Sequence, residues 1–321
     1  MNNILITGGA GFIGSHFIEY LKKQKHPYNK VIILDKLTYA GDLIRIQNQL
    51  DDDFIFIQGD ICDSDIVESI FQSYKIETVV NFAAESHVDR SIEDVSSFIQ
   101  TNYIGVQILM DIAKSNWNGN GKFIQISTDE VFGSSKDMTL EKNTETSLLN
   151  PMNPYAATKA SAELLIKSYN NTFNFPGVII RSTNNYGSMQ NEEKLIPKVM
   201  QAVLNHKDIP IYGNGEYYRD WLHVSNTCEA IYRVTTGSKI HECYNIAGTG
   251  LISNIDLIQM IISLFKEKGH EYRGKLQFVK DRPGHDYCYL VDDKKYLSTF
   301  TMKKMSLNEG LKQLVISVLY T

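Results

Sequence analysis

The chain has 321 residues, of which 43% are hydrophobic and 21% charged, so it can bury a large core in one or two lobes. This composition excludes a disordered chain, and the net charge of −5 disfavours a nucleic-acid partner, because surfaces that track phosphates usually carry a basic excess. The four cysteines have no CxxC pair, which indicates neither a metal site nor a disulfide framework and fits a reducing compartment.

The ends and the apolar runs of the chain give no targeting or membrane signal. The sequence opens with MNNILITGG, which begins a strand at once, without the basic and apolar regions of a secretion signal. No later run approaches the roughly 18 to 20 apolar residues that span a bilayer. We therefore expect a cytoplasmic protein with no membrane partner.

The first half of the sequence alternates short β-branched runs with longer amphipathic segments. Strands are predicted at 4–7, 31–35, 54–58, 78–82 and 123–127, and long helices at 95–116 and 154–173. Such alternation is typical of a Rossmann-type α/β fold with a doubly wound parallel sheet. After residue 185 the alternation fades. This predicts a doubly wound domain at 1–185 and a smaller mixed α/β lobe at 186–321, with the chain interleaving between the two.

A glycine-rich turn follows the first predicted strand. In ILITGGAGFIGSHF, Gly8, Gly11 and Gly14 lie three residues apart at the start of a helix. They permit a tight turn, close approach of the backbone to a pyrophosphate, and close packing of helix on strand. Asp35 ends the next strand, where a carboxylate hydrogen-bonds a ribose diol and repels a 2′-phosphate. NAD is therefore the expected cofactor, although the neighbouring Lys36 would suit NADP.

Two later strand ends are expected to complete the cofactor site. Asp60 and Ile61 follow the third strand, where an adenine ring would lie. The segment FAAES follows the fourth strand, beside the expected nicotinamide ribose, and contributes Phe82, Ala83, Ala84 and Ser86. Tight packing alone would also account for the two alanines.

A tyrosine and a lysine four residues apart form the predicted catalytic pair. In NPYAATKA, Tyr155 and Lys159 would share one face of a helix. A phenol of ordinary pKa is a poor base at neutral pH, but a nearby ammonium and an oxidised nicotinamide both favour the phenolate. Alone, the pair is also typical of an exposed amphipathic helix. Behind a dinucleotide fingerprint, it indicates hydride transfer between an alcohol and a ketone.

Together these motifs resemble those of the extended short-chain dehydrogenase/reductases that act on nucleotide sugars, and the similarity covers nearly the whole chain. The matching stretches include TGGAGFIGS, AAESHVDRS, STDEVFG, NPYAATKAS, PIYGNGEYYRDWLHV and DRPGHD. STDEV, AAESHVDRS and RPGHD are the most specific, and they are similar to segments of the family's 4,6-dehydratases. The resemblance implies an NAD-dependent hydro-lyase that converts dTDP-glucose to a 4-keto-6-deoxy sugar for rhamnose-type surface glycans.

The resemblance also implies catalytic roles: Thr128 and Tyr155 at the sugar's 4-hydroxyl, Asp129 as acid, Glu130 as base and Lys159 as the tuner of Tyr155. After oxidation at carbon 4, loss of the carbon 6 hydroxyl needs one group to take the carbon 5 proton and another to protonate the leaving oxygen. A 4-epimerase needs no such pair. Asp129 must start protonated, so we expect burial and the neighbouring carboxylate to raise its pKa. Taken alone, two adjacent acids would indicate a solvated turn or a helix N-cap.

Further site residues are implied by the same resemblance. Those added to the cofactor site are Phe12, Ile13, Leu37, Thr38, Thr101 and Asn185, with Ser86, Tyr155 and Lys159 also beside the cofactor. Those at the substrate are Ser86, Thr128, Asn184, Lys194, Leu195, Pro210, Ile211, Tyr212, Asn254 and His285. Arg219 and Arg282 are the predicted diphosphate partners, since guanidinium groups bind such oxygens in bidentate fashion. Asn184 and Asn185 could instead be turn residues, and His223 is expected to be structural.

One departure from the family pattern bears on the substrate. After RPGHD the family usually shows basic residues, whereas this chain has Tyr287 and Cys288, so contacts near the diphosphate or base can differ. Four alternatives stay open: a 4-epimerase, a decarboxylase of UDP-glucuronate, a dehydratase for another nucleotide sugar, and a catalytically inactive NAD-binding scaffold. In relatives, the helices near 95–116 and 155–173 pair into a four-helix interface, which implies a homodimer.

Overall fold

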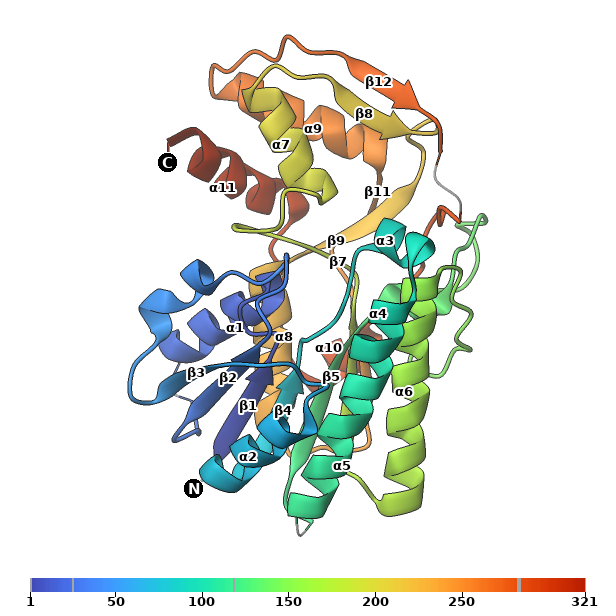
Figure 1. Cartoon of the computed structure of the whole chain (residues 1–321). Helices are drawn as coiled ribbons and strands as arrows, with labels where there is room; N and C mark the ends of the chain where they lie inside the picture. Colours follow the sequence, from blue (N-terminus) through green and yellow to red (C-terminus); the bar gives the residue numbers. More distant parts are fainter. Residues whose placement is uncertain (1, 25, 118, 282–283, 321) are drawn as a thin grey trace.

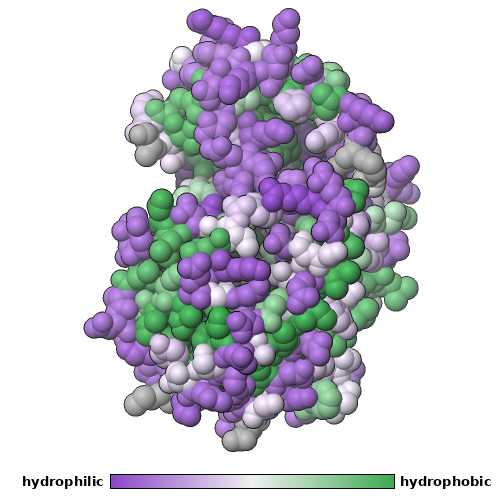
Figure 2. Space-filling model, in the orientation of Figure 1, coloured by the Kyte–Doolittle hydropathy of each residue, from purple (hydrophilic) through white to green (hydrophobic). Residues whose placement is uncertain are grey.

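The computed structural model describes residues 2–24, 26–117, 119–281 and 284–320. A large lobe is built on a seven-stranded parallel sheet, and a smaller lobe lies above it in the view of Figure 1. The molecule narrows between the two lobes (Figure 2). Within the described ranges, no helix combines the length and the apolar character needed to cross a membrane.

The large sheet has the strand order β10-β6-β5-β4-β1-β2-β3, which confirms the predicted doubly wound fold. Its strands are β1 (Asn3–Thr7), β2 (Val31–Asp35), β3 (Phe54–Gln58), β4 (Ile76–Asn81), β5 (Lys122–Thr128), β6 (Gly177–Ser182) and β10 (Cys243–Ile246). The helices around it are α1 (Phe12–Lys23), α2 (Ser64–Tyr74), α3 (Val88–Glu93), α4 (Ser96–Ile99), α5 (Val106–Asn116), α6 (Pro154–Phe173), α8 (Val224–Thr236) and α10 (Lys294–Thr299). The five strands predicted from sequence match to within two residues at each end.

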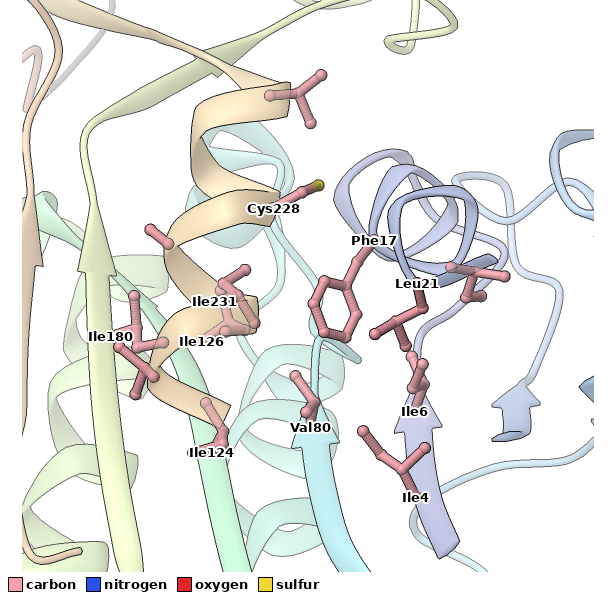
Figure 3. Close-up of a cluster of buried hydrophobic side chains, with 14 of the residues drawn as sticks. Ile4, Ile6, Phe17, Leu21, Val80, Ile124, Ile126, Ile180, Cys228 and Ile231 are labelled. Carbon is pink, nitrogen blue, oxygen red and sulfur yellow. The ribbon is translucent and has the colours of Figure 1, made fainter. Parts of the chain in front are cut away.

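Alternate residues of each central strand face opposite sides of this sheet, which explains its uninterrupted apolar runs. Ile4 and Ile6 of β1 pack with α1 and α8, where Phe17 and Ile231 lie against them in one buried cluster (Figure 3). Leu5, between them, packs on the other face with α2, α5 and α6. Both faces are therefore covered, as a parallel sheet requires.

The predicted helix at 95–116 is not one continuous α-helix. A π-helical segment at Gln100–Gly105 separates α4 from α5. Within it, buried Asn102 accepts a hydrogen bond from the backbone N–H of Glu85 and donates to its carbonyl and to Thr158. Hydrophobic spacing cannot distinguish this wider turn from an α-helix, but the turn fixes the loop that follows β4.

The smaller lobe has its own apolar core, formed by α7 (Leu195–Leu204), α9 (Asn254–Glu267) and α11 (Leu307–Tyr320). Strands β8 (Ile209–Tyr212) and β12 (Leu276–Val279) form a parallel pair there. A three-stranded sheet of β7 (Asn184–Tyr186), β9 (Tyr218–His223) and β11 (Leu251–Ser253) lies between the lobes. The chain crosses between the lobes more than once. After β8 in the smaller lobe, β10 returns to the large sheet and pairs with β6, and α9 and α11 then lie in the smaller lobe again.

Candidate active site

A continuous cleft runs along the carboxyl ends of the large sheet and under the smaller lobe. It has three parts, which we call the β2 pocket, the central pocket and the lobe pocket. Gly8, Gly11 and Phe82 line both the β2 pocket and the central pocket. Ser86 and Glu130 line both the central pocket and the lobe pocket. One extended ligand can therefore occupy two neighbouring parts, and two ligands can meet in the centre.

The glycine turn packs closely on neighbouring backbone, where side chains cannot fit. Gly8 has φ +66°, and a Cβ on it would lie 2.5 Å from the backbone nitrogen of Ala83. A Cβ on Gly14 would lie 2.4 Å from the carbonyl oxygen of Gly8. Gly11 is the N-cap of α1, so the N-terminus of that helix faces the cleft, as an anionic diphosphate requires.

Asp35 lies at the far end of the β2 pocket. Its carboxylate accepts hydrogen bonds from the backbone N–H groups of Ala10 (2.9 Å) and Leu37 (2.8 Å). Burial raises the pKa of Asp35, and the two backbone bonds oppose that rise. Lys36, the residue that would suit NADP, pairs with Asp60, with Nζ 2.6 Å from Oδ2. Its charge is thus neutralised inside the pocket, which favours NAD.

The other predicted cofactor residues line the cleft, with one exception. Those brought together in the β2 and central pockets are Phe12, Ile13, Thr38, Asp60, Ile61, Ala83, Ala84, Thr101 and Asn185. The side chain of Leu37 packs against the apolar cluster on the α1 and α8 side instead. Leu37 has φ 56°, and this left-handed backbone places its N–H on Asp35.

The two adjacent acids follow the end of β5 in a short 3₁₀ turn at Asp129–Phe132. The hydroxyl of Thr128 donates to Oδ1 of Asp129 over 3.2 Å and accepts from the backbone N–H of Glu130 over 3.3 Å. Asp129 is 2% exposed, and its Oδ2 has no hydrogen-bond partner among the described residues. Burial and the charge of Glu130 raise the pKa of Asp129, which confirms the expectation from the sequence.

Tyr155 and Lys159 lie one helical turn apart on α6, and both line the central pocket. Burial and the charge of Glu130 raise the pKa of the Tyr155 phenol. Burial lowers the pKa of Lys159 to about 8, and its Nζ donates to the backbone carbonyl of Ile126 over 2.6 Å. The protein alone thus favours a neutral phenol, and the tuning of Tyr155 by Lys159 stays a prediction.

Of the predicted substrate residues, Thr128 lines the central pocket, and the lobe pocket collects ten others. They are Ser86, Asn184, Lys194, Leu195, Pro210, Ile211, Tyr212, Arg219, Asn254 and His285. The guanidinium of Arg219 donates to the carbonyls of Tyr218 (2.7 Å) and Asp286 (2.9 Å), which hold it against this wall. Arg282 lies outside the described residues.

The departures at Tyr287 and Cys288 are accommodated largely through the backbone. The N–H of Tyr287 donates to Ser134, and its carbonyl accepts from the N–H of Tyr218. Cys288 is buried, and its carbonyl accepts from the N–H of Ser135. His223 caps the start of α8 through a bond from the N–H of Ser225, so its expected structural role is confirmed.

Several cleft residues escape the sequence analysis. Asn153 and Tyr289 contact Glu130, with distances to its Oε2 of 3.1 Å from Nδ2 and 3.4 Å from the hydroxyl. Others that line the cleft are Arg45, His87, Gln190, Glu193, Lys198 and Trp221. Only Asn153 carries a local signal, because it directly precedes Pro154 as a helix N-cap residue.

Known proteins resemble this chain over nearly its whole length. The family model described as GDP-mannose 4,6 dehydratase matches residues 5–314. A dTDP-glucose 4,6-dehydratase of Haemophilus influenzae is 38% identical over 335 residues, covering 98% of this chain and 97% of the relative. The low-salt glycan biosynthesis protein Agl12 of Haloferax volcanii is 40% identical over 314 residues, with the same coverage of both chains.

A solved structure adds the fold and a cofactor. The dTDP-glucose 4,6-dehydratase of Bacillus anthracis, in complex with NAD, matches with a TM-score of 0.88 and 36% identity over 98% of this chain and 96% of that one. Sequence and structure thus agree over almost the full length. The chain therefore belongs to the GDP-mannose 4,6 dehydratase family, with dTDP-glucose 4,6-dehydratases among its full-length relatives.

Proposed function

We propose that this protein is an NAD-dependent nucleotide-sugar 4,6-dehydratase, a hydro-lyase that converts dTDP-glucose to dTDP-4-keto-6-deoxyglucose and water. One observation carries the proposal: a buried acid, Asp129, lies next to a second acid, Glu130, in the pocket that holds Tyr155. The high similarity to dTDP-glucose 4,6-dehydratases over nearly the full length supports both the reaction and the substrate. The product is a precursor for deoxysugars of surface glycans.

The β2 and central pockets fit NAD. Gly8 and Gly14 permit the tight turn, because a Cβ on either would clash with neighbouring backbone, the α1 N-terminus faces the diphosphate position, and Asp35 suits a ribose diol. Bound there, NAD supplies a hydride acceptor for the sugar's carbon 4 and later the hydride for carbon 6. In the same proposal, the lobe pocket takes the nucleotide and its diphosphate, with Lys194 and Arg219 as cationic partners.

The protein's own groups move three protons. Tyr155 takes the proton of the 4-hydroxyl, assisted by Thr128. Glu130 removes the carbon 5 proton, which the new carbonyl at carbon 4 has made acidic, and Asp129 protonates the hydroxyl that leaves carbon 6 as water. Carbon 5 then regains a proton that has exchanged with solvent, which completes the 4-keto-6-deoxy sugar. The raised pKa of Asp129 keeps it protonated for that step. A 4-epimerase has no use for this acid and base, so the pair favours dehydration.

The experiment that tests this function is incubation of the purified protein with dTDP-glucose in deuterated water, with analysis of the sugar by mass spectrometry and NMR. We expect a 4-keto-6-deoxy product with deuterium at carbon 5. A 4-epimer would contradict the dehydratase assignment. No conversion of any sugar nucleotide, even with added NAD, would favour a catalytically inactive scaffold.

We also propose a homodimer through the helices α4, α5 and α6. A groove between α4, the π-helical segment that follows it and α6 is lined by Ile99, Tyr103, Leu164 and Leu165, and Ile99 and Leu164 are 45% and 58% exposed. Such apolar positions on neighbouring helices suit a four-helix interface. Light scattering checks this: we expect a dimer for the native chain and a monomer for Leu164→Glu. Phe278→Glu, at an exposed apolar position of β12, is the control and should stay dimeric.

A cytoplasmic location is the last part of the proposal. The thiols of Cys62, Cys228, Cys243 and Cys288 are all unpaired, which a reducing compartment preserves. Fractionation of the producing cells, with the protein followed by antibody, checks the location.

A further inference from the structure

Glu130 shares its hydrogen-bond donors with a second carboxylate, Asp286. Asn153 donates through Nδ2 to Oε2 of Glu130 (3.1 Å) and to Oδ2 of Asp286 (3.2 Å). The hydroxyl of Tyr289 lies within hydrogen-bond range of the same two oxygens, closer to Asp286 than to Glu130. Two acids thus face one amide and one phenol.

Two of these four residues line the lobe pocket, and the other two lie behind them. Glu130 and Tyr289 line the lobe pocket, whereas Asp286 and Asn153 are 2% and 5% exposed and are not among the residues that line it. The backbone around Asp286 is fixed, because its carbonyl accepts from Arg219 and the next N–H donates to Ser134. Asp286 therefore acts on the reaction only through its neighbours.

The donors differ in how many bonds they can give. An amide has two N–H groups, so Asn153 can serve both carboxylates, but a phenol has a single O–H. In this structure the Tyr289 hydroxyl lies 3.4 Å from Glu130 and makes its shorter bond to Asp286. A carboxylate that receives a strong bond becomes a weaker base, because the bond stabilises its ionised form. The direction of this one hydrogen therefore decides whether the Glu130 carboxylate receives a bond from Asn153 alone or from both donors.

We propose that Asp286 is a positioning residue for dehydration, which draws the Tyr289 hydroxyl away from Glu130 and so leaves the Glu130 carboxylate able to take the carbon 5 proton. The inference rests on the proposed function, since it concerns one step of that reaction. In that step the carbon 5–hydrogen bond breaks, its proton moves to Glu130, and its electron pair enters the enolate conjugated with the carbon 4 oxygen. The enolate then expels the carbon 6 hydroxyl, which leaves as water with the proton from Asp129.

The decisive comparison uses Asp286→Asn, Tyr289→Phe and the double variant. In Asp286→Asn the phenol loses its charged acceptor and turns to Glu130. We expect deuterium incorporation at carbon 5 to slow by about 10- to 100-fold, the usual effect of one hydrogen bond to a charged group. Oxidation at carbon 4 should persist, so the absorbance of reduced nicotinamide should accumulate. KM should change by less than about threefold, since Asp286 is not among the residues that line the lobe pocket.

The double variant separates this mechanism from a merely structural effect. Removing the phenol hydroxyl in the Asp286→Asn background also removes the bond that weakens Glu130, so exchange at carbon 5 should recover by roughly fivefold or more over Asp286→Asn alone. If Asp286 only supported the fold, the second substitution would bring no recovery. Exchange equal to or slower than that of the single variant therefore overturns the proposal.

Asp293→Asn is the matched control. Asp293 is another largely buried carboxylate, paired with Lys304, and neither residue is among those that line the cleft. It should lose some stability without accumulating reduced nicotinamide. The two proposals fail in different ways. If the native protein makes no 4-keto-6-deoxy sugar, both the proposed function and this inference are wrong. If the native protein turns over and Asp286→Asn incorporates deuterium at carbon 5 at the native rate, only the inference is wrong.

Discussion

Arg181 on β6 and Glu163 on α6 form an ion pair in which both side chains are completely buried. The guanidinium donates through Nε and Nη2 to the carboxylate, and Ser127 donates to it as well, over 2.6 Å. Glu163 lies one helical turn after Lys159, and its charge opposes the lowering of the Lys159 pKa. The pair thus joins two elements directly behind the catalytic residues.

Removing one member of this pair should be far more harmful than removing a surface charge. Arg181→Met leaves Glu163 buried and uncompensated, so we expect the free energy of unfolding to fall by about 3–5 kcal/mol. Urea denaturation followed by circular dichroism measures the change. Arg233→Met is the control, because its pair with Glu229 is partly exposed and should contribute no more than about 1 kcal/mol. Equal losses in the two variants would contradict a special role for the buried pair.

Asp129→Asn should stop the reaction after the first hydride transfer. The amide cannot protonate the leaving hydroxyl, so turnover should fall by about 10²- to 10⁴-fold while reduced nicotinamide forms and persists. Stopped-flow absorbance with dTDP-glucose measures this. Loss of the first hydride transfer as well would show that Asp129 acts earlier than proposed.

The same substitution should alter how stability depends on pH. The pKa of Asp129 is raised on folding, so the folded chain binds more protons than the unfolded chain above the ordinary Asp range. Stability contributed by this group is therefore present at low pH and lost as pH rises through the folded pKa. Asp129→Asn should gain stability relative to the native chain as pH rises. Urea midpoints that differ by a constant amount at every pH would contradict the raised pKa.

Gly8→Ala should remove cofactor binding and also destabilise the fold. The new Cβ would lie 2.5 Å from the Ala83 nitrogen, in a residue whose φ of +66° already disfavours a side chain. Gly269→Ala is the matched control, since its φ is +82° but nothing lies within 4 Å of the new Cβ. We expect the control to lose about 1–2 kcal/mol from backbone strain and to retain NAD. Fluorescence titration with NADH and thermal melts of both variants test this, and equal NADH affinity in the two would contradict it.

The local patterns of the sequence predict much of the large sheet and little of the second half of the chain. The helix predicted at 154–173 matches α6 at both ends, because Asn153 and Pro154 mark its start. β10 has no such mark: its four residues become a strand by pairing with β6, which ends about 60 residues earlier in the chain. Pairing over such a separation leaves no local periodicity.

The glycine turn, Asp35 and the pair of Tyr155 and Lys159 could be predicted because each belongs to a short motif whose spacing has a chemical reason, whereas most of the other cofactor and catalytic residues are implied by the family resemblance. The set around Glu130 could not be predicted, since residues 153, 286 and 289 meet only in the folded chain. The spacing of residues along the sequence does not predict the hydrogen bond from Asn153 to Asp286. These residues meet through a tertiary contact between the loop before α6 and the segment that follows β12, which no local pattern of the sequence records.

The late return of β10 has a consequence for synthesis of the chain. The outer edge of β6 stays unpaired until residue 246 has been made, and the apolar face covered by α8 stays open until residue 236. A nascent or truncated chain that ends near residue 185 exposes both, and unpaired edges beside apolar surface favour aggregation. The large lobe therefore cannot complete its sheet until β10 has emerged from the ribosome.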